Sequence, residues 1–156
     1  MTAQRSKPRT QPASKQKLRL WIRLLGASRA IEAELRRRLR AEFGETLPRF
    51  DVMAALQRRP HGMIMTELSR YLMVSNGNVT GIVERLVAEG HVMRLPVEAD
   101  RRATFVRLTP KGTQHFEGMA SVHEAWVSEL LAHFDSGETD TLIELLATRH
   151  PPSLRT

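Results

Sequence analysis

Apolar residues recur at helical spacing along most of the chain. From about Lys15 to Phe43 they return every three or four residues with no proline between them, which predicts one helix roughly 40 Å long. Such a helix is longer than one small core can cover, so we expect it to pack against another chain. Gly44 then ends it. Its apolar members are Leu18, Trp21, Leu24, Leu25, Ile31, Leu35, Leu39 and Phe43.

After Gly44 the pattern predicts further helices with a small β-hairpin among them. The fold class expected is therefore mainly α, with a hairpin of two short strands. The first predicted elements are a helix capped by Thr46 and ended at 58–60, and a short strand within 61–64. A helix over Glu67–Met73 capped by Thr66 follows, then a helix from Ser75 to about Val87 and strands at 92–95 and 104–108. The last two are a helix from Thr109-Pro110 to about Phe134 and a helix from Asp135-Ser136 that Pro151 closes.

The stretch Val74–Leu86, VSNGNVTGIVERL, has an apolar face and a polar beginning. Its dipeptide Asn76-Gly77 is typical of a tight hairpin, but a hairpin needs alternating strands on both sides, and both flanks have helical spacing. A helix capped by Ser75 fits better. The residues of its apolar face, spaced i, i+3, i+4, i+7 and i+8, are Val79, Ile82, Val83, Leu86 and Val87.

Two short helices joined by about two residues form a helix-turn-helix, and the second of them opens with Ser, Asn, Gly, Asn and Thr. A recognition helix enters the DNA major groove with its N-terminal end, where short polar side chains meet base edges and the helix dipole faces phosphates. The alternative is that these polar residues only cap the helix.

The loop between the two predicted strands, VEADRRA, is charged. A charged hairpin directly after such a helix is typical of the wing of a winged helix. Arginine at a hairpin tip can enter a narrow minor groove, where the negative potential is enhanced. The alternative is a solvated turn with an ion pair between Asp100 and Arg101 or Arg102. Both interpretations can hold at once.

The net charge of +7 is unevenly distributed. Residues 1–20 contain six basic residues and no acidic ones, in a sequence rich in Pro, Ser and Gln that we expect to be disordered. This tail is either simply solvated or follows DNA phosphates. Residues 47–111 contain ten basic and six acidic residues, whereas residues 112–156 contain two basic and seven acidic residues. The basic excess within the expected folded region therefore lies around the helix-turn-helix and the hairpin.

The sequence argues against several other classes of protein. It has no cysteine, no stretch of about 18 apolar residues and no apolar segment behind its basic N-terminus, so we expect a soluble cytoplasmic protein without a membrane span. The motif of a zinc hydrolase begins at His123-Glu124 but fails at Val127, and no hydrolase or nucleotide-binding motif occurs. We therefore expect neither an enzyme nor a bound cofactor or metal.

The segments TELSRYLMVSNGNVTGIVERLVAEGHVMR and DRRATFVRLTPKG resemble the MarR family of bacterial transcriptional regulators. This resemblance extends over roughly residues 18–148 and implies a homodimeric winged helix-turn-helix protein that binds double-stranded DNA at a pseudo-palindromic operator. The implied organisation is a disordered basic tail at 1–17, a helical dimerisation region at 18–45 and 112–150, and a DNA-binding lobe at 46–111.

The resemblance also implies which residues contact DNA. Arg101 or Arg102 would enter the minor groove, Asp100 would hold the wing through Arg85, and Arg70 would contact a phosphate. One position departs from the family pattern, because Gly81 stands where many members carry a larger, often basic side chain. A base contact common in the family is then missing here or replaced by Asn78. The residues expected to face bases or nearby phosphates are Ser75, Asn76, Asn78 and Thr80.

Members of this family commonly bind small aromatic carboxylates, which weaken DNA binding. The segments RLWIRLL, LPRFDVMAAL and MVSNGNVTG are similar to a branch that responds to hydroxycinnamates or their coenzyme A thioesters. Trp21, Arg29 and Phe50 are the candidate ligand residues, or else ordinary interface and surface positions. The function expected is a ligand-responsive repressor. The alternative is a winged-helix module that binds proteins without sequence-specific DNA binding.

Overall fold

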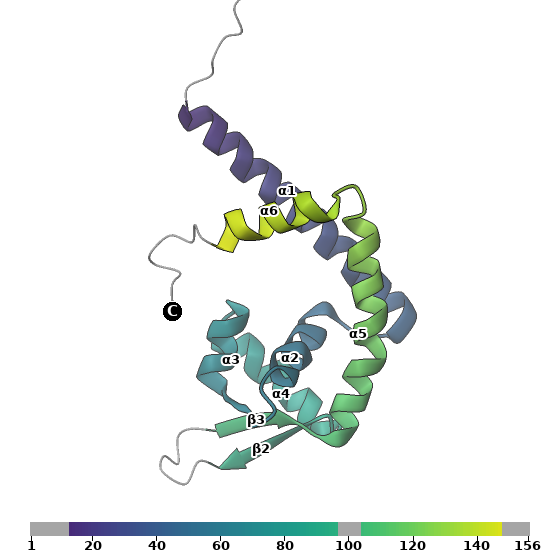
Figure 1. Ribbon diagram of the computed structural model, residues 1–156. Coiled ribbons are helices and arrows are strands. Elements are labelled where there is room, and N and C mark those ends of the chain that lie inside the picture. The colour runs from purple at the N-terminus through teal and green to yellow at the C-terminus, as the bar shows by residue number, and fades with distance from the viewer. Residues whose placement is uncertain (1–12, 97–103, 148–156) are drawn as a thin grey trace, which may run out of the picture. The chain divides into compact units, whose positions relative to one another are not determined.

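The structure, a computed structural model, describes residues 13–96 and 104–147, with only the backbone of Asn76 (Figure 1). It confirms the predicted class, mainly α with a small sheet, and the predicted order of elements. The elements are α1 (Ala13–Phe43), α2 (Leu47–Gln57), β1 (Met63–Ile64), α3 (Met65–Leu72), α4 (Asn76–Ala88), β2 (Val92–Pro96), β3 (Thr104–Leu108), α5 (Pro110–Leu130) and α6 (Ser136–Ala147).

Three predicted boundaries differ from the structure by two or more residues. α1 begins at Ala13 and so includes part of the predicted tail. The prediction that Thr66 caps the third helix is wrong, because α3 already begins at Met65. The Glu67 carboxylate accepts a hydrogen bond of 3.3 Å from the Ile64 backbone N–H, which satisfies a donor at the helix start one turn earlier.

The third difference is that α5 ends at Leu130, before the predicted end at Phe134. Asp135 and Glu138 explain this early end, because they bond reciprocally at the start of α6. The Glu138 backbone N–H donates to Asp135 Oδ1 at 2.8 Å, and the Asp135 N–H donates to Glu138 Oε2 at 3.1 Å. This capping box starts a new helix, so the chain must leave α5 first.

Backbone contacts divide the chain into two units, Met1–Glu34 and Leu35–Thr156. In the first unit, the described part of α1 exposes large apolar side chains, including Trp21 at 58%. In the second unit, α6 has no buried residue and exposes Leu142, Ile143, Leu145 and Leu146. None of the described helices is long and apolar enough to cross a membrane.

The core of the second unit centres on α2. This helix contacts α3, α4, α5 and β3, which Figure 1 shows gathered around it. A proline in its first turn fits a helix start, since proline lacks the N–H that would be unsatisfied there. The fully buried large side chains of this core are Leu39, Met53, Leu56, Leu68, Leu86, Met119, Val52, Val79, Val83, Val92 and Val106.

The three strands form an antiparallel sheet in the order β1-β3-β2. Gly62 leads the chain into β1 with a φ of +97°, a conformation that other residues rarely adopt. A Cβ at Gly62 would also lie 2.9 Å from the Val106 carbonyl oxygen, so only glycine lets the chain enter the sheet here. β2 and β3 are paired from Val92↔Leu108 to Pro96↔Thr104, so the described pairing reaches both sides of the segment 97–103.

Candidate DNA-binding site

Helices α3 and α4 form the predicted helix-turn-helix. Val79, Val83 and Leu86 of α4 are fully buried, and Leu68 of α3 is buried with them. Both helices contact each other and α2. These apolar side chains fix the orientation of α4 about its own axis, so its opposite face, predicted to be polar, is turned outward.

The turn between the two helices depends on a left-handed residue. Met73 has a φ of +53°, and its N–H donates to the Arg70 carbonyl oxygen at 3.1 Å. Val74 N–H donates to the Ser69 carbonyl oxygen at 3.1 Å, which closes the end of α3. The turn leaves the Met73 side chain 84% exposed beside the start of α4.

The predicted base-contacting residues lie at the N-terminal end of α4. Ser75 is the N-cap residue, as predicted, but its side chain makes no capping hydrogen bond. The side chains of Ser75 and Asn78 are exposed, and Thr80 is half-buried. Asn76 is the first residue of α4, and its side chain is outside the described part of the structure. This end of the helix therefore exposes the polar side chains of Ser75 and Asn78.

Two glycines interrupt this outer face. A Cβ added at Gly77 or at Gly81 would meet no atom within 4 Å beyond the helix itself. Neither helix packing nor backbone conformation requires glycine at these positions, since both lie inside α4 without a positive φ. Glycine in a helix interior, the position of Gly81, costs about 1 kcal/mol relative to alanine. Packing within the chain therefore does not explain why glycine stands at these positions, whereas the close approach of another molecule would explain it.

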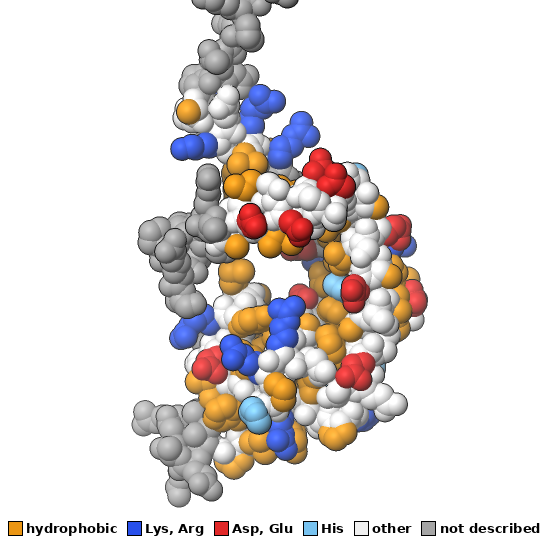
Figure 2. Space-filling view, viewed as in Figure 1, with side chains coloured by type: hydrophobic (Ala, Val, Ile, Leu, Met, Phe, Trp, Pro, Cys, Tyr) orange, Lys and Arg blue, Asp and Glu red, His pale blue; other side chains and the backbone are white. Residues whose placement is uncertain are grey.

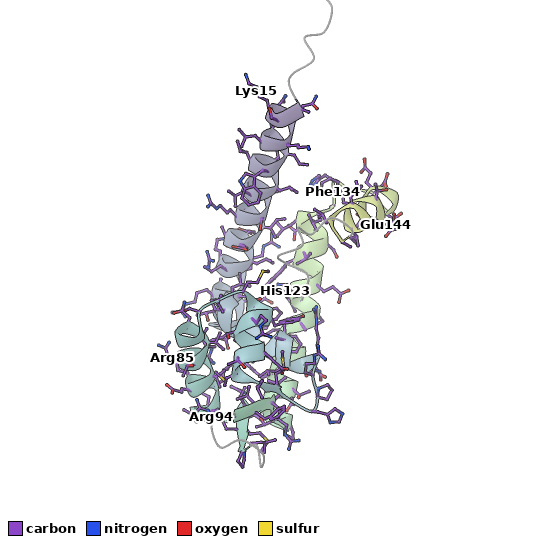
Figure 3. The ribbon with its side chains drawn as sticks, turned by 90° about the vertical axis from the view of Figure 1, so that its left-hand side faces the viewer. Lys15, Arg85, Arg94, His123, Phe134 and Glu144 are labelled. Atoms are coloured by element: carbon purple, nitrogen blue, oxygen red, sulfur yellow. The ribbon has the colours of Figure 1, made fainter. Side chains whose placement is uncertain are left out.

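The hairpin of β2 and β3 lies next to α4 in the chain and contacts it through β2. Arg94 of β2 and Glu84 of α4 form an exposed ion pair of 3.8 Å that was not predicted. Arg85, on the same flank of the lobe as Arg94 in Figure 3, is exposed. Its expected partner Asp100 and the expected minor-groove residues Arg101 and Arg102 lie outside the described residues.

A second basic group, missed in the sequence, surrounds α3. Exposed Arg70 lines a groove of about 390 Å³ together with Arg59 and Tyr71. Arg58 Nη1 donates to the Tyr71 hydroxyl at 2.8 Å, which ties the end of α2 to α3. Figure 2 shows basic side chains gathered on this part of the lobe. The sequence marked Arg58-Arg59 only as the end of a helix, and the tertiary structure brings them to Arg70.

The candidate ligand residues are in different environments. Trp21 and Arg29 are exposed and belong to the first unit. Phe50 is 5% exposed in the second unit, where its ring stacks on His123 with centroids 4.4 Å apart. Burial lowers the pKa of His123 from its ordinary value. Among the described residues, no cluster of His, Asp or Glu is placed to hold a metal ion.

A hollow of about 330 Å³ lies between α2 and α4. We call it the α2–α4 hollow. Asp51 is the charged residue among its described lining, and Asn78 connects it to the outer end of α4. Its lining consists of Pro48, Asp51, Val52, Leu72, Val74, Asn78, Val79 and Ile82. A ligand in this hollow would contact the helix that carries the expected base contacts.

The comparisons with known proteins all lead to the same family. The sequence profile of the MarR family matches residues 43–103. The chain is 36% identical to the transcriptional activatory protein BadR of Rhodopseudomonas palustris, over 82% of this chain and 75% of BadR. A mutant MarR from E. coli in complex with operator DNA superposes with a TM-score of 0.76 at 25% identity, over 90% of this chain and 100% of that one. A MarR family regulator from Silicibacter pomeroyi gives a TM-score of 0.73 at 32% identity, over 89% of this chain and 96% of that one.

Proposed function

The chain belongs to the MarR family of transcriptional regulators, and we propose that it binds a pseudo-palindromic operator as a homodimer through α4 and its wing. A regulator of bacterial genes works on DNA in the cytoplasm. Ser75, Asn76, Asn78 and Thr80 would face bases or nearby phosphates in the major groove. Arg101 or Arg102 would enter the minor groove, while Asp100 and Arg85 would hold the wing.

The observation that carries this proposal is the outer face of α4. Asn78 is exposed at the helix end, and Gly77 and Gly81 beside it leave space that intramolecular packing does not use. Such a surface lets a helix backbone approach the floor of the major groove closely. The basic residues Arg58, Arg59 and Arg70 on the adjacent side suit the phosphate backbone, which supplies much of the affinity of any DNA-binding protein.

Exposed apolar side chains support the homodimer. α6 exposes Ile143 at 60% and Leu146 at 52%, and the described part of α1 in the first unit exposes Leu20 at 60%. Helices with unburied apolar faces mark interaction sites when the patches are large. A second copy of the chain is the partner we propose, and the two recognition helices would then reach half-sites about one DNA turn apart.

Replacing Asn78 by alanine is expected to weaken binding to the operator by about 1–3 kcal/mol and to relax specificity at particular base pairs. The physical reason is that an asparagine amide both donates to and accepts from one adenine edge, and alanine can do neither. The measurement is fluorescence anisotropy on a fragment from the upstream region of the protein's own gene, together with a panel of single base-pair changes at about 150 mM salt.

The matched control is Ser121→Ala, which removes an exposed polar side chain from α5. Equal losses on every sequence of the panel would contradict a base contact by Asn78. If the unaltered protein showed no sequence preference at this salt concentration, the alternative function, a winged-helix module for protein contacts, would replace the regulator.

The sign of regulation stays a prediction of repression. Family membership does not determine this sign, because BadR is named an activatory protein. A reporter gene placed behind the operator decides it, since deletion of the regulator raises expression from a repressed promoter and lowers expression from an activated one.

We propose that a small aromatic acyl compound releases the protein from DNA by entering the α2–α4 hollow. The hollow is mostly apolar and touches Asn78 and Val79 of the recognition helix, so its occupant can change the position of that helix. Asp51 is its charged lining residue. A free carboxylate placed there would meet the like charge of exposed Asp51, whereas the acyl group of a coenzyme A thioester carries no charge.

The thioester is therefore expected to release the operator at a concentration about tenfold lower than the free acid, which corresponds to ~1.4 kcal/mol. Hydroxycinnamoyl-coenzyme A and hydroxycinnamate serve as the two probes, titrated against the preformed protein–DNA complex. Asp51→Asn should narrow the difference between them, because it removes the repulsion without changing the size of the side chain.

Asp140→Asn on α6 is the control, since it removes an exposed carboxylate that does not line the hollow. A free acid that acts at the same concentration as the thioester would refute the proposed ligand class. An unchanged ratio in Asp51→Asn would show that the compounds bind elsewhere, including at Trp21, Arg29 or Phe50.

A further inference from the structure

His91 lies at the point where the recognition helix, the wing and α5 meet. It follows the end of α4 and directly precedes β2. Its backbone N–H donates to the Leu86 carbonyl oxygen at 2.8 Å, and its own carbonyl oxygen accepts from the Thr109 N–H at 3.0 Å. Any displacement of His91 must therefore move the end of α4, the start of the wing or the start of α5.

The imidazole ring of His91 stacks on the ring of His115 from α5, with centroids 4.5 Å apart and planes 17° apart. Each ring also approaches one carboxylate. His115 Nε2 lies 3.3 Å from Glu45 Oε2, and His91 Nε2 lies 3.8 Å from Glu89 Oε2. We call these four residues, together with Arg49 and Lys111 beside them, the histidine junction.

Two cations complete the histidine junction. Arg49 of α2 forms ion pairs with both Glu45 and Glu89, so it neutralises much of the carboxylate charge beside the two histidine rings. Lys111 of α5 donates to the Glu89 carbonyl oxygen at 2.7 Å. The charged groups that face the two rings thus come from the α1–α2 connection (Glu45), α2 (Arg49), the end of α4 (Glu89) and α5 (Lys111).

The surroundings of His91 favour its neutral form. Its side chain is only 12% exposed, and its Nδ1 atom is buried without a hydrogen-bond partner. Burial and the charges of His115, Lys111 and Arg49 lower the pKa of His91 below its ordinary value of about 6.5, although Glu89 acts in the opposite direction. A proton on His91 would have to be accommodated against a ring that already packs face to face.

We propose that the His91–His115 pair is a pH-sensitive latch, which holds α4 and the wing in their DNA-binding arrangement near neutral pH and releases them in acid. This inference rests on the proposed function for its effect on DNA. The latch itself is a property of the fold. The stacked rings join α5 to the connection between α4 and β2, and a proton on His91 would place a positive charge beside Lys111 and Arg49.

The direction of the pH effect follows from protonation linkage. Because the pKa of His91 is lower in the folded protein than in the unfolded chain, the unfolded or opened state binds more protons. The stability that neutral His91 contributes is present above about pH 6.5 and is lost as the pH falls through the lowered pKa. Opening of the junction, and with it loss of operator binding, is therefore expected below about pH 6.5.

This direction is opposite to the usual effect of acid on a DNA-binding protein. Protonation of exposed histidines makes a protein more positive and strengthens its attraction to phosphates. The chain has six histidines, so acid alone should raise its affinity for DNA. A loss of affinity in acid would point to a specific opening of the structure.

The experiment measures operator affinity and the thermal unfolding midpoint at pH 7.5 and pH 5.5, with the ionic strength held constant. In the unaltered protein, operator affinity and the unfolding midpoint should both fall from pH 7.5 to pH 5.5, because the pKa of His91 is lowered in the folded protein. His91→Phe keeps a flat ring in the stack but cannot be protonated, so its affinity should change by less than about twofold. His115→Phe tests the same latch from the other ring. His133→Gln, at an exposed position outside the junction, should behave as the unaltered protein does.

The outcomes separate the latch from the proposed function. A protein without any sequence-specific DNA binding at pH 7.5 would refute the proposed function, and the unfolding midpoints and an NMR titration of the histidine rings would still test the latch. The latch is refuted if both phenylalanine variants retain the full loss of affinity and of midpoint in acid. If His91→Phe does not fold, His115→Phe and the NMR titration of the unaltered protein decide, and a His91 ring that titrates at 6.5 or above overturns the proposal.

Discussion

The Gly112→Ala variant is expected to lose on the order of 3 kcal/mol or more of its free energy of unfolding. A Cβ at this position would lie 2.7 Å from the carbonyl carbon of His91 and closer still to its oxygen. Real Cβ atoms do not approach backbone carbonyls so closely, so α5 or the His91 backbone would have to move. Denaturant unfolding followed by circular dichroism measures the loss.

The first turn of α5 gives this glycine little room to relax. The Gly112 N–H donates to the Thr109 hydroxyl at 3.0 Å, and that hydroxyl donates in turn to the Gly90 carbonyl oxygen at 2.6 Å. A shift of α5 large enough to hold the methyl group would therefore break bonds that tie it to the end of α4. Operator binding should fall together with stability, since the same contacts position the recognition helix and the wing.

Gly118→Ala is the matched control on the same helix. A Cβ there meets nothing within 4 Å, so alanine should stabilise the protein by up to about 1 kcal/mol through helix propensity alone. A Gly112→Ala variant as stable as the unaltered protein would show that the close approach of the two backbones does not constrain the fold.

The second large effect is expected from Arg49→Met, which should destabilise the protein by about 3 kcal/mol. The Arg49 side chain is 15% exposed and bridges Glu45, which is 6% exposed as a residue, to Glu89. Methionine keeps much of the volume of arginine but leaves the Glu45 carboxylate buried without its main cation. Thermal and denaturant unfolding at pH 7.5 measure the loss.

The pH dependence of this variant gives an independent check. The hydrogen bond from Arg49 is the main cause that lowers the pKa of Glu89 below its ordinary value of about 4.5. A carboxylate whose pKa is lower in the folded protein stabilises the fold at pH values above its pKa in the unfolded chain. This stabilisation is lost as the pH falls through its pKa in the folded protein. In Arg49→Met the acid loss of stability between about pH 5 and pH 3 should therefore become shallower.

Arg94→Met is the control for Arg49→Met, because it removes an ion pair of 3.8 Å whose side chains are 41% and 61% exposed. Exposed pairs of this kind contribute less than about 1 kcal/mol. Equal losses in the two variants would mean that the buried ion pair of Glu45 and Arg49 contributes no more to the free energy of unfolding than the exposed pair does.

The sequence by itself determined the local elements and the face that each one buries. Val79, Val83 and Leu86 recur at helical spacing, and these three side chains are buried along α4. Thr109-Pro110 marked the start of α5 correctly, because capping and the missing N–H of proline act within one turn. The polar outer end of α4, with Asn78, followed from the same periodicity.

Where the sequence placed the end of a helix wrongly, a hydrogen bond between residues close in the chain explains the observed end. α3 begins before Thr66 because the Glu67 carboxylate reaches the Ile64 backbone, and α5 ends early because Asp135 and Glu138 cap the next helix. Several cap residues compete at such boundaries with similar energies, so a pattern of residue types places them only to within a few positions.

Only the tertiary structure decided which distant residues share one environment. Glu45 and Arg49 are four residues apart, and Glu89 and His91 are two apart, but no spacing in the chain relates these two segments to each other or to His115. The need for glycine at position 112 likewise depends on the carbonyl of His91, which packs against it from another element. Side-chain periodicity is a property of one segment, whereas steric clashes and charge pairing depend on how segments approach one another. The sequence therefore determined the helix proposed to read DNA, and only the folded structure showed the junction that holds its far end.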